Sequence, residues 1–197
     1  MSQIKLKHSG GNSVIIAAPD SNPASDRTLK LPSDGDGTIL TTNSATGKIL
    51  QVKQTVKTDV FSSSSTSFVD VTGLSVNITT TGSNKVLVLA QCTVVGTDAG
   101  TGIMLDRGGN EPLKADAEGN RQRFTITGGY GSGGFHYGNG ANHISFLDSP
   151  GAGTHTYKIK AKTRTSSTFY LNSTTHRDND TNTSNSTSTI TVMEVAA

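Results

Sequence analysis

Apolar and polar residues alternate along much of the chain, the period that places successive side chains on opposite faces of a β-strand. In residues 74–79, LSVNIT, the side chains of Leu74, Val76 and Ile78 fall on one face of an extended segment. The three-to-four-residue spacing of an amphipathic helix is nearly absent. The pattern therefore predicts an all-β protein.

Residues 157–162, YKIKAK, alternate in the same way, with lysine at every polar position. We expect Tyr157, Ile159 and Ala161 to point into a core and the intervening lysines to point to water. On this interpretation the lysine row is the solvated side of a sheet and not a binding tract.

Other short segments bounded by turn residues are also predicted to be strands. They are residues 52–58, 86–90, 103–105, 124–127, 143–146, 168–171 and 189–195. The continuous apolar run VLVLA at residues 86–90 is expected to be buried on both faces. So many short strands predict an antiparallel β-sandwich of the jelly-roll kind over residues 49–197.

Residues 1–48 differ from the rest of the chain. They contain three short strand-like pieces, 4–8, 13–17 and 28–31, separated by Gly-Gly, Asn-Pro and Asp-Gly turn signals. Strands this short and this poor in apolar residues could hardly form a domain alone, so pairing between chains would have to supply the missing burial. We expect an intertwined stalk or docking segment that serves trimerisation.

Composition also favours self-association. Only 32% of the 197 residues are hydrophobic and tryptophan is absent, so the core is thin for the length of the chain. A chain of this kind often completes its burial by associating with copies of itself.

Charge and cysteine content narrow the range of partners. The formal net charge is +2 without any basic block, which argues against nucleic acid as a partner. No apolar run approaches the roughly 18 residues of a membrane span, so no membrane insertion is expected. Cys92, the single cysteine, lies in the apolar run VLVLAQCTVV and is predicted to be a buried thiol.

The sequence contains only incomplete matches to motifs that bind phosphate, calcium or other metals. Residues 129–134, GYGSGG, match a phosphate-binding pattern, but no helical pattern follows them, so a surface loop is predicted. Asp178, Asp180 and Asn182 alternate like calcium ligands, yet Thr183 stands where such a loop needs glycine. The histidines are scattered, although one on a threefold axis would become three ligands. We expect no enzyme, no cofactor and no resident metal.

Two loops are the candidate contact sites for a partner or receptor. Residues 128–142 combine aromatic side chains with glycines, as surfaces that stack on sugars or proteins do; alternatively Phe135 and Tyr137 pin this loop to the sheet. Residues 172–187 form the second loop. The candidate contact residues are Tyr130, Phe135, His136, Tyr137, Asn139, His176, Arg177, Asp178 and Asp180.

Four stretches together resemble a known family. They are IKLKHSGGNSVIIAAPDSNPASDRTLKLPSDGDGTIL near the N-terminus, then SSTSFVDVTGLSVNITTTGSNKVLVLAQCTVVG, ISFLDSPGAGTHTYKIKAKT and STITVMEVAA. The first resembles the opening segment of marine bacteriophage tail-fibre and virion appendage proteins, especially those of cyanophages. The others look like the β-sandwich domain that follows it. The sequence lacks the extended repeated shaft of a typical long fibre.

The resemblance implies a homotrimeric virion protein, assembled in the host cytoplasm, whose jelly-roll head is similar in shape to the C1q and tumour-necrosis-factor heads. The N-terminal segment would attach to other virion proteins, and the sandwich would display loops toward a host surface glycan or protein. Two other roles stay open: a capsid decoration, cement or head-fibre protein, and a polysaccharide-degrading spike. The resemblance supplies no catalytic residue.

Overall fold

The computed structural model describes residues 3–7, 9–11, 13–17, 49–97, 100–128, 140–165, 167–175, 179, 181 and 183–197. The chain divides into two compact units, Met1–Ser44 and Ala45–Ala197. In the first unit β1 (Gln3–Lys7) pairs antiparallel with β2 (Ser13–Ala17). These strands match two of the predicted N-terminal pieces, and the third, residues 28–31, lies outside the described residues.

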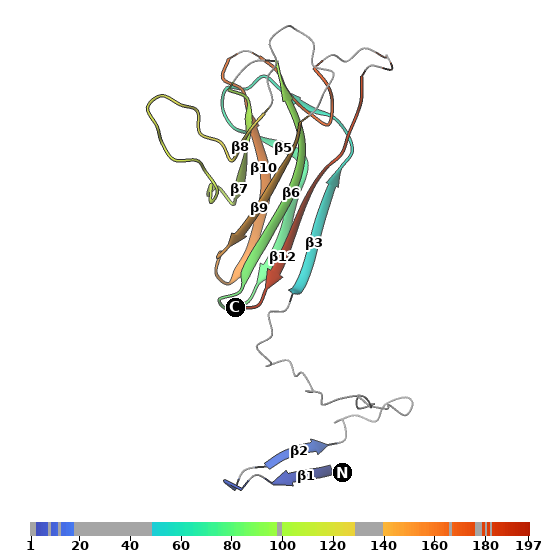
Figure 1. The fold of residues 1–197 in the computed structure, drawn as a ribbon, viewed down its shortest axis with the longest axis vertical. Coiled ribbons are helices and arrows are strands. Elements are labelled where there is room, and N and C mark those ends of the chain that lie inside the picture. The colour runs from blue at the N-terminus through green and yellow to red at the C-terminus, as the bar shows by residue number, and fades with distance from the viewer. Residues whose placement is uncertain are drawn as a thin grey trace. The chain divides into compact units, whose positions relative to one another are not determined.

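The second unit consists of antiparallel strands joined by turns and loops (Figure 1). The strands are β3 (Ile49–Lys57), β4 (Phe61–Ser63), β5 (Val69–Thr80), β6 (Lys85–Gly96), β7 (Gly102–Arg107), β8 (Ile126–Thr127), β9 (Gly140–Asp148), β10 (Gly153–Lys162), β11 (Phe169–Leu171) and β12 (Ser188–Val195). No helix is present among the described residues, so none there is long and apolar enough to cross a membrane.

The strands form two sheets. In the larger sheet β6 pairs with β9 along one side, and with β12 and then β11 along the other; β3 and β4 lie outermost. The smaller sheet has the order β5-β10-β7-β8. If β3, β5, β6, β7, β8, β9, β10 and β12 are numbered 1 to 8, the sheets read 1-8-3-6 and 2-7-4-5. This is the strand order of a jelly roll, so the predicted all-β sandwich is confirmed.

The core lies between the two sheets and follows the predicted alternation. Leu74 and Ile78 of β5 are buried, as are Tyr157 and Ile159 of β10. Cys92 is a free thiol with no exposed surface, and its burial raises the pKa of the thiol to about 12. The prediction of a buried, unpaired cysteine is therefore confirmed.

The apolar run at residues 86–90 corrects one prediction. Val86, Val88 and Ala90 are buried between the sheets, but Leu87 and Leu89 point the other way and keep part of their surface exposed. Burial on both faces is therefore wrong for the single chain, because the smaller sheet covers only one face of the larger one.

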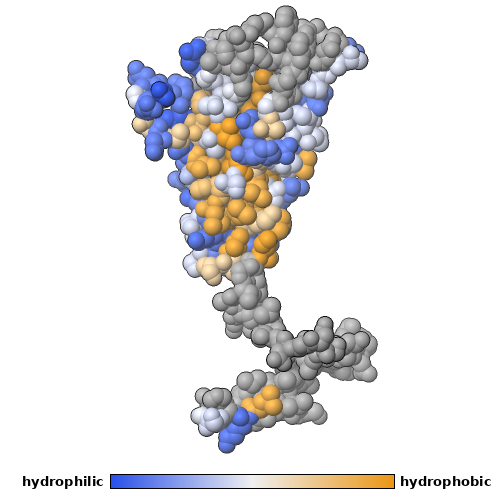
Figure 2. Space-filling model, in the orientation of Figure 1, coloured by the Kyte–Doolittle hydropathy of each residue, from blue (hydrophilic) through white to orange (hydrophobic). Residues whose placement is uncertain are grey.

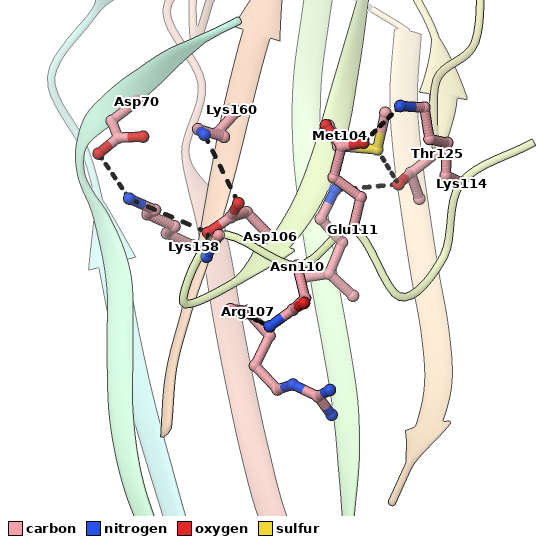
Figure 3. A network of polar contacts seen from close by, with 12 residues as sticks. Asp70, Met104, Asp106, Arg107, Asn110, Glu111, Lys114, Thr125, Lys158 and Lys160 are labelled. Carbon is pink, nitrogen blue, oxygen red and sulfur yellow. Dashed lines mark hydrogen bonds and ion pairs between the residues drawn. The ribbon is translucent and has the colours of Figure 1, made fainter. Parts of the chain in front are cut away.

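The lysines of β10 point outward as predicted, but they are not simply solvated. Lys158 is ion-paired with Asp70 at 2.8 Å, and Lys160 lies 3.5 Å from the buried carboxylate of Asp106 (Figure 3). Lys162 donates a hydrogen bond to Gln122 and lies over the rings of Phe68 and Phe124. Lys158 and Lys160 therefore pair with carboxylates of the neighbouring strands β5 and β7, and Lys162 joins the sheet to side chains outside its strands.

A buried carboxylate joins β12 to the neighbouring strands. Glu194 accepts hydrogen bonds from Gln51 of β3, from the backbone N–H of Thr81 and from the side chain of Asn84. Burial by itself would raise the pKa of the Glu194 carboxyl, but the hydrogen bonds to the charged form outweigh it and lower this pKa.

This lowered pKa predicts a loss of stability in acid. A carboxyl whose pKa is lower in the folded than in the unfolded chain stabilises the fold above its unfolded pKa, about 4.3 for glutamate, and loses that contribution as pH falls through the folded pKa. We expect Glu194→Gln to flatten the pH dependence of the unfolding free energy below about pH 4.3. The measurement is urea unfolding at a series of pH values. Glu118→Gln, at a side chain that is 73% exposed, is the matched control and should leave the dependence unchanged.

Candidate functional site

Nine contact residues in two loops are predicted from the sequence. All nine, from Tyr130 to Asp180, lie outside the described residues, as does the whole of the GYGSGG segment. The structure therefore neither brings these residues together nor separates them, and they stay predictions. Two other surfaces of the sandwich have the features of functional sites.

The first surface is the outer side of the larger sheet, which we call the apolar face. One cross-strand row runs over its whole width, because Val52 is opposite Met193, Met193 is opposite Leu87, and Leu87 is opposite Leu147. Val52 and Leu147 are 52% and 49% exposed. The apolar face consists of Leu50, Val52, Val56, Leu87, Leu89, Leu147, Met193 and Val195. Figure 2 shows hydrophobic residues gathered over this sheet.

Polar residues continue the apolar face toward one end of the sheet. There β6, β9 and β12 enclose a shallow hollow of about 300 Å³ lined by, among others, Gln91, His143, Ser145 and Thr191. In the larger sheet, the outward positions of β3, β6, β9 and β12 include no carboxylate, and Lys85 is the one lysine among them. A surface without strong charge can meet a second copy of itself without like-charge repulsion.

The second surface is a pocket built on a buried hydrogen-bond cluster at the end of β7. The Asp148 carboxylate at the end of β9 accepts hydrogen bonds from Arg107 Nη1 at 2.5 Å and from the Tyr157 hydroxyl at 2.8 Å. Burial raises the pKa of Tyr157 well above its usual value, and the hydrogen bond to Asp148 adds to this effect. Tyr157 is therefore a neutral donor, and the cluster holds Arg107 in a fixed orientation.

The pocket beside this cluster has a volume of about 360 Å³ and is mainly polar in character. It is lined by Arg107, Gly108, Asn110, Pro150, Thr154, His155 and Thr156. The His155 Nε2 lies 3.1 Å from the carbonyl oxygen of Gly151. Because a carbonyl oxygen can only accept, Nε2 carries the ring hydrogen and donates a hydrogen bond to it. The lining thus combines a guanidinium, hydroxyls, an amide and an imidazole.

Histidine and carboxylate side chains can also bind a metal ion where several of them come together. Within the described part of the chain, no group of three or more histidine, cysteine, aspartate or glutamate side chains could hold an ion. His143 and His155 are described and lie on different strands, β9 and β10.

Sequence reasoning missed both surfaces for different reasons. For the apolar face a signal existed, because Leu87 and Leu89 break the alternation of β6. For the pocket no local signal existed, because Arg107 and Asp148 are separated by 41 residues and meet only in the folded sandwich.

Comparison with known proteins adds no relationship. No family model matches the chain, and no curated protein matches its sequence.

Proposed function

We propose that the protein is a non-enzymatic structural protein of a bacteriophage particle. It forms a homotrimer through the apolar face, attaches to the particle through its N-terminal segment, and acts as a tail fibre or fibre tip that displays host-binding loops. The observation that carries the proposal is the exposed apolar row over the full width of a jelly-roll sheet. The number of copies and the virion role derive from the resemblance of the sequence to phage appendage proteins.

The dimensions of the face support association with further copies. Strands about 4.8 Å apart and rising about 3.4 Å per residue give a face of roughly 20 by 20 Å, about 400 Å². Monomeric proteins rarely expose a larger apolar patch than this without a function for it. A standard interface buries about 800 Å² on each partner, so the polar residues around the apolar row would be buried with it.

The apolar character of the face also supplies a driving force. Burial of apolar surface contributes about 25 cal/mol per Å², so about 400 Å² on each copy contributes roughly 10 kcal/mol before the cost of association. The outward positions of β3, β6, β9 and β12 contain no carboxylate, so repulsion between carboxylates does not oppose the association of copies through this face.

A charged side chain in the apolar row should therefore abolish assembly. We expect the full chain at micromolar concentration to have three times its 20.5 kDa mass by light scattering. Val52→Lys and Leu147→Lys should each give a monomer with an unchanged circular dichroism spectrum, since half of each side chain already reaches solvent. Asn77→Lys adds the same charge at an exposed position of β5 in the smaller sheet and should leave the trimer intact.

Two results would count against the assembly. One is a monomeric wild-type chain at this concentration, and the other is a trimer that survives both lysine substitutions on the apolar face. The place on the particle is tested separately by gold-labelled antibody on purified virions. Label at the tail tip supports a fibre, whereas label spread over the capsid would mean a decoration protein instead.

A further inference from the structure

We propose that the pocket beside Arg107 is a binding site for an acidic sugar residue, a carboxylate-bearing saccharide such as a uronic acid. The inference rests on the proposed function in one respect, because such a sugar would belong to the host surface to which the particle attaches. The site itself is defined by the described residues alone and lies apart from the apolar face.

Arg107 is the group that would bind the carboxylate. A guanidinium carries five N–H donors in a rigid fork, more than Asp148 and Tyr157 together can use. The Arg107 side chain keeps 22% of its surface exposed although its partner Asp148 is nearly buried. Figure 3 shows the guanidinium pointing away from the cluster formed by Asp106 and the lysines of β10. Its remaining donors can therefore pair with an anion in the pocket in the bidentate manner typical of carboxylate recognition.

The rest of the lining fits the hydroxyl groups of a sugar. Asn110 uses one amide hydrogen on the carbonyl of Arg107 and keeps its carbonyl oxygen as an acceptor. Thr154 adds a hydroxyl that also shares a hydrogen bond with the Thr79 hydroxyl at 2.9 Å. His155 adds an imidazole whose Nε2 donates to Gly151, so that its Nδ1 is the acceptor offered to a ligand. Pro150 contributes an apolar surface against which the C–H groups of a ring can lie. No carboxylate lines the pocket itself, and the nearby carboxylate of Asp148 is already paired with Arg107.

Size and charge favour a sugar acid over a smaller or more highly charged anion. A volume of about 360 Å³ lies near the lower end of the range of ligand pockets, about 300–1,000 Å³, and suits one monosaccharide unit. For a phosphate dianion the pocket offers one guanidinium, that of Arg107, which is already ion-paired with Asp148. A singly charged uronate needs one guanidinium for its carboxylate, and its hydroxyls can use the amide, hydroxyl and imidazole groups.

The backbone holds this arrangement before any ligand arrives. Arg107 and Asn110 exchange two backbone hydrogen bonds across the turn that follows β7, at 2.7 and 3.0 Å. The N–H of Gly108 donates to the carbonyl oxygen of Thr156, which ties this turn to β10. A preorganised site spends less of its interaction energy on ordering its own groups when the ligand binds.

The test is calorimetric titration of the full chain with sodium glucuronate, with glucose and inorganic phosphate as reference ligands. We expect glucuronate to bind with a Kd of about 1 mM and glucose, which has the same ring without the carboxylate, at least tenfold more weakly. Arg107→Lys keeps a cation beside Asp148 but loses the fork, and should weaken glucuronate binding about tenfold. Arg121→Lys, at a side chain that is 75% exposed, is the matched control and should change nothing.

Each other outcome overturns part or all of the assignment. Equal affinities for glucose and glucuronate would show that Arg107 does not bind the carboxylate. Equal affinities for phosphate and glucuronate would show that the pocket is a general anion site. Absence of glucuronate binding to the folded wild-type chain would refute the site. Should Arg107→Lys fail to fold, Thr154→Val removes one lining hydroxyl without touching the Asp148 cluster, and unchanged glucuronate affinity would then count against the pocket. Light scattering on the same samples separates this result from the fate of the trimer.

Discussion

Asn172→Ala is expected to lower the free energy of unfolding by about 4 kcal/mol, the largest effect we foresee for any single substitution. Asn172 is fully buried at the end of β11 and adopts a φ of +63°. Its side-chain amide donates to the carbonyl oxygens of Lys57 and Asp59, and its side-chain oxygen accepts from the Ser188 hydroxyl. Alanine would leave these buried partners unpaired, and it disfavours the left-handed conformation. Urea unfolding at one fixed protein concentration measures the change.

Two companion variants identify the cause of this loss. Asn172→Gly relieves the backbone but not the hydrogen bonds, and should be about 1 kcal/mol less damaging than alanine. Asn142→Ala in β9 removes an exposed hydrogen bond from the side-chain amide to the nearby carbonyl oxygen of Gly140, and should cost less than about 0.5 kcal/mol. If Asn172→Ala were as mild as Asn142→Ala, the buried network would contribute nothing to stability.

Asp148→Ala is expected to cost about 3 kcal/mol of stability, the second largest effect. The substitution removes the acceptor for the Arg107 guanidinium, for the buried Tyr157 hydroxyl and for the backbone N–H of Ser149. The figure lies at the lower end for a broken buried ion pair because Arg107 keeps some contact with solvent. Denaturant unfolding monitored by tyrosine fluorescence would measure the loss.

Two aspartate variants serve as references. Asp148→Asn keeps a side-chain oxygen in place and should cost about half as much as alanine. Asp70→Ala breaks the ion pair with Lys158, but Asp70 is 54% exposed, so a loss of at most about 1 kcal/mol is expected. If Asp148→Ala and Asp70→Ala lowered the free energy of unfolding equally, burial of the Arg107 cluster would add nothing to stability.

The faces of the strands could be predicted from sequence better than the ends. Alternation assigned Leu74 and Tyr157 to the core correctly, because it depends only on the geometry of an extended chain. Strand ends differ from the prediction where glycine and polar residues continue a ladder: β10 begins at Gly153, four residues before the predicted segment 157–162. β4, with the sequence FSS, was not predicted, because its pairing with β11 comes from tertiary contacts and not from its own residues.

Side-chain alternation and hydropathy are enough to predict an all-β sandwich, the buried faces of β5 and β10, and a buried thiol at Cys92, because these properties depend on the local sequence. The position of Leu87 and Leu89 on a face that no second sheet covers follows from the tertiary structure, since an apolar run looks the same whichever chain completes its burial. The tertiary structure also brings Arg107, Asp148 and Tyr157 together in one buried cluster. Contacts between distant strands depend on sheet order and register, which local sequence patterns do not encode.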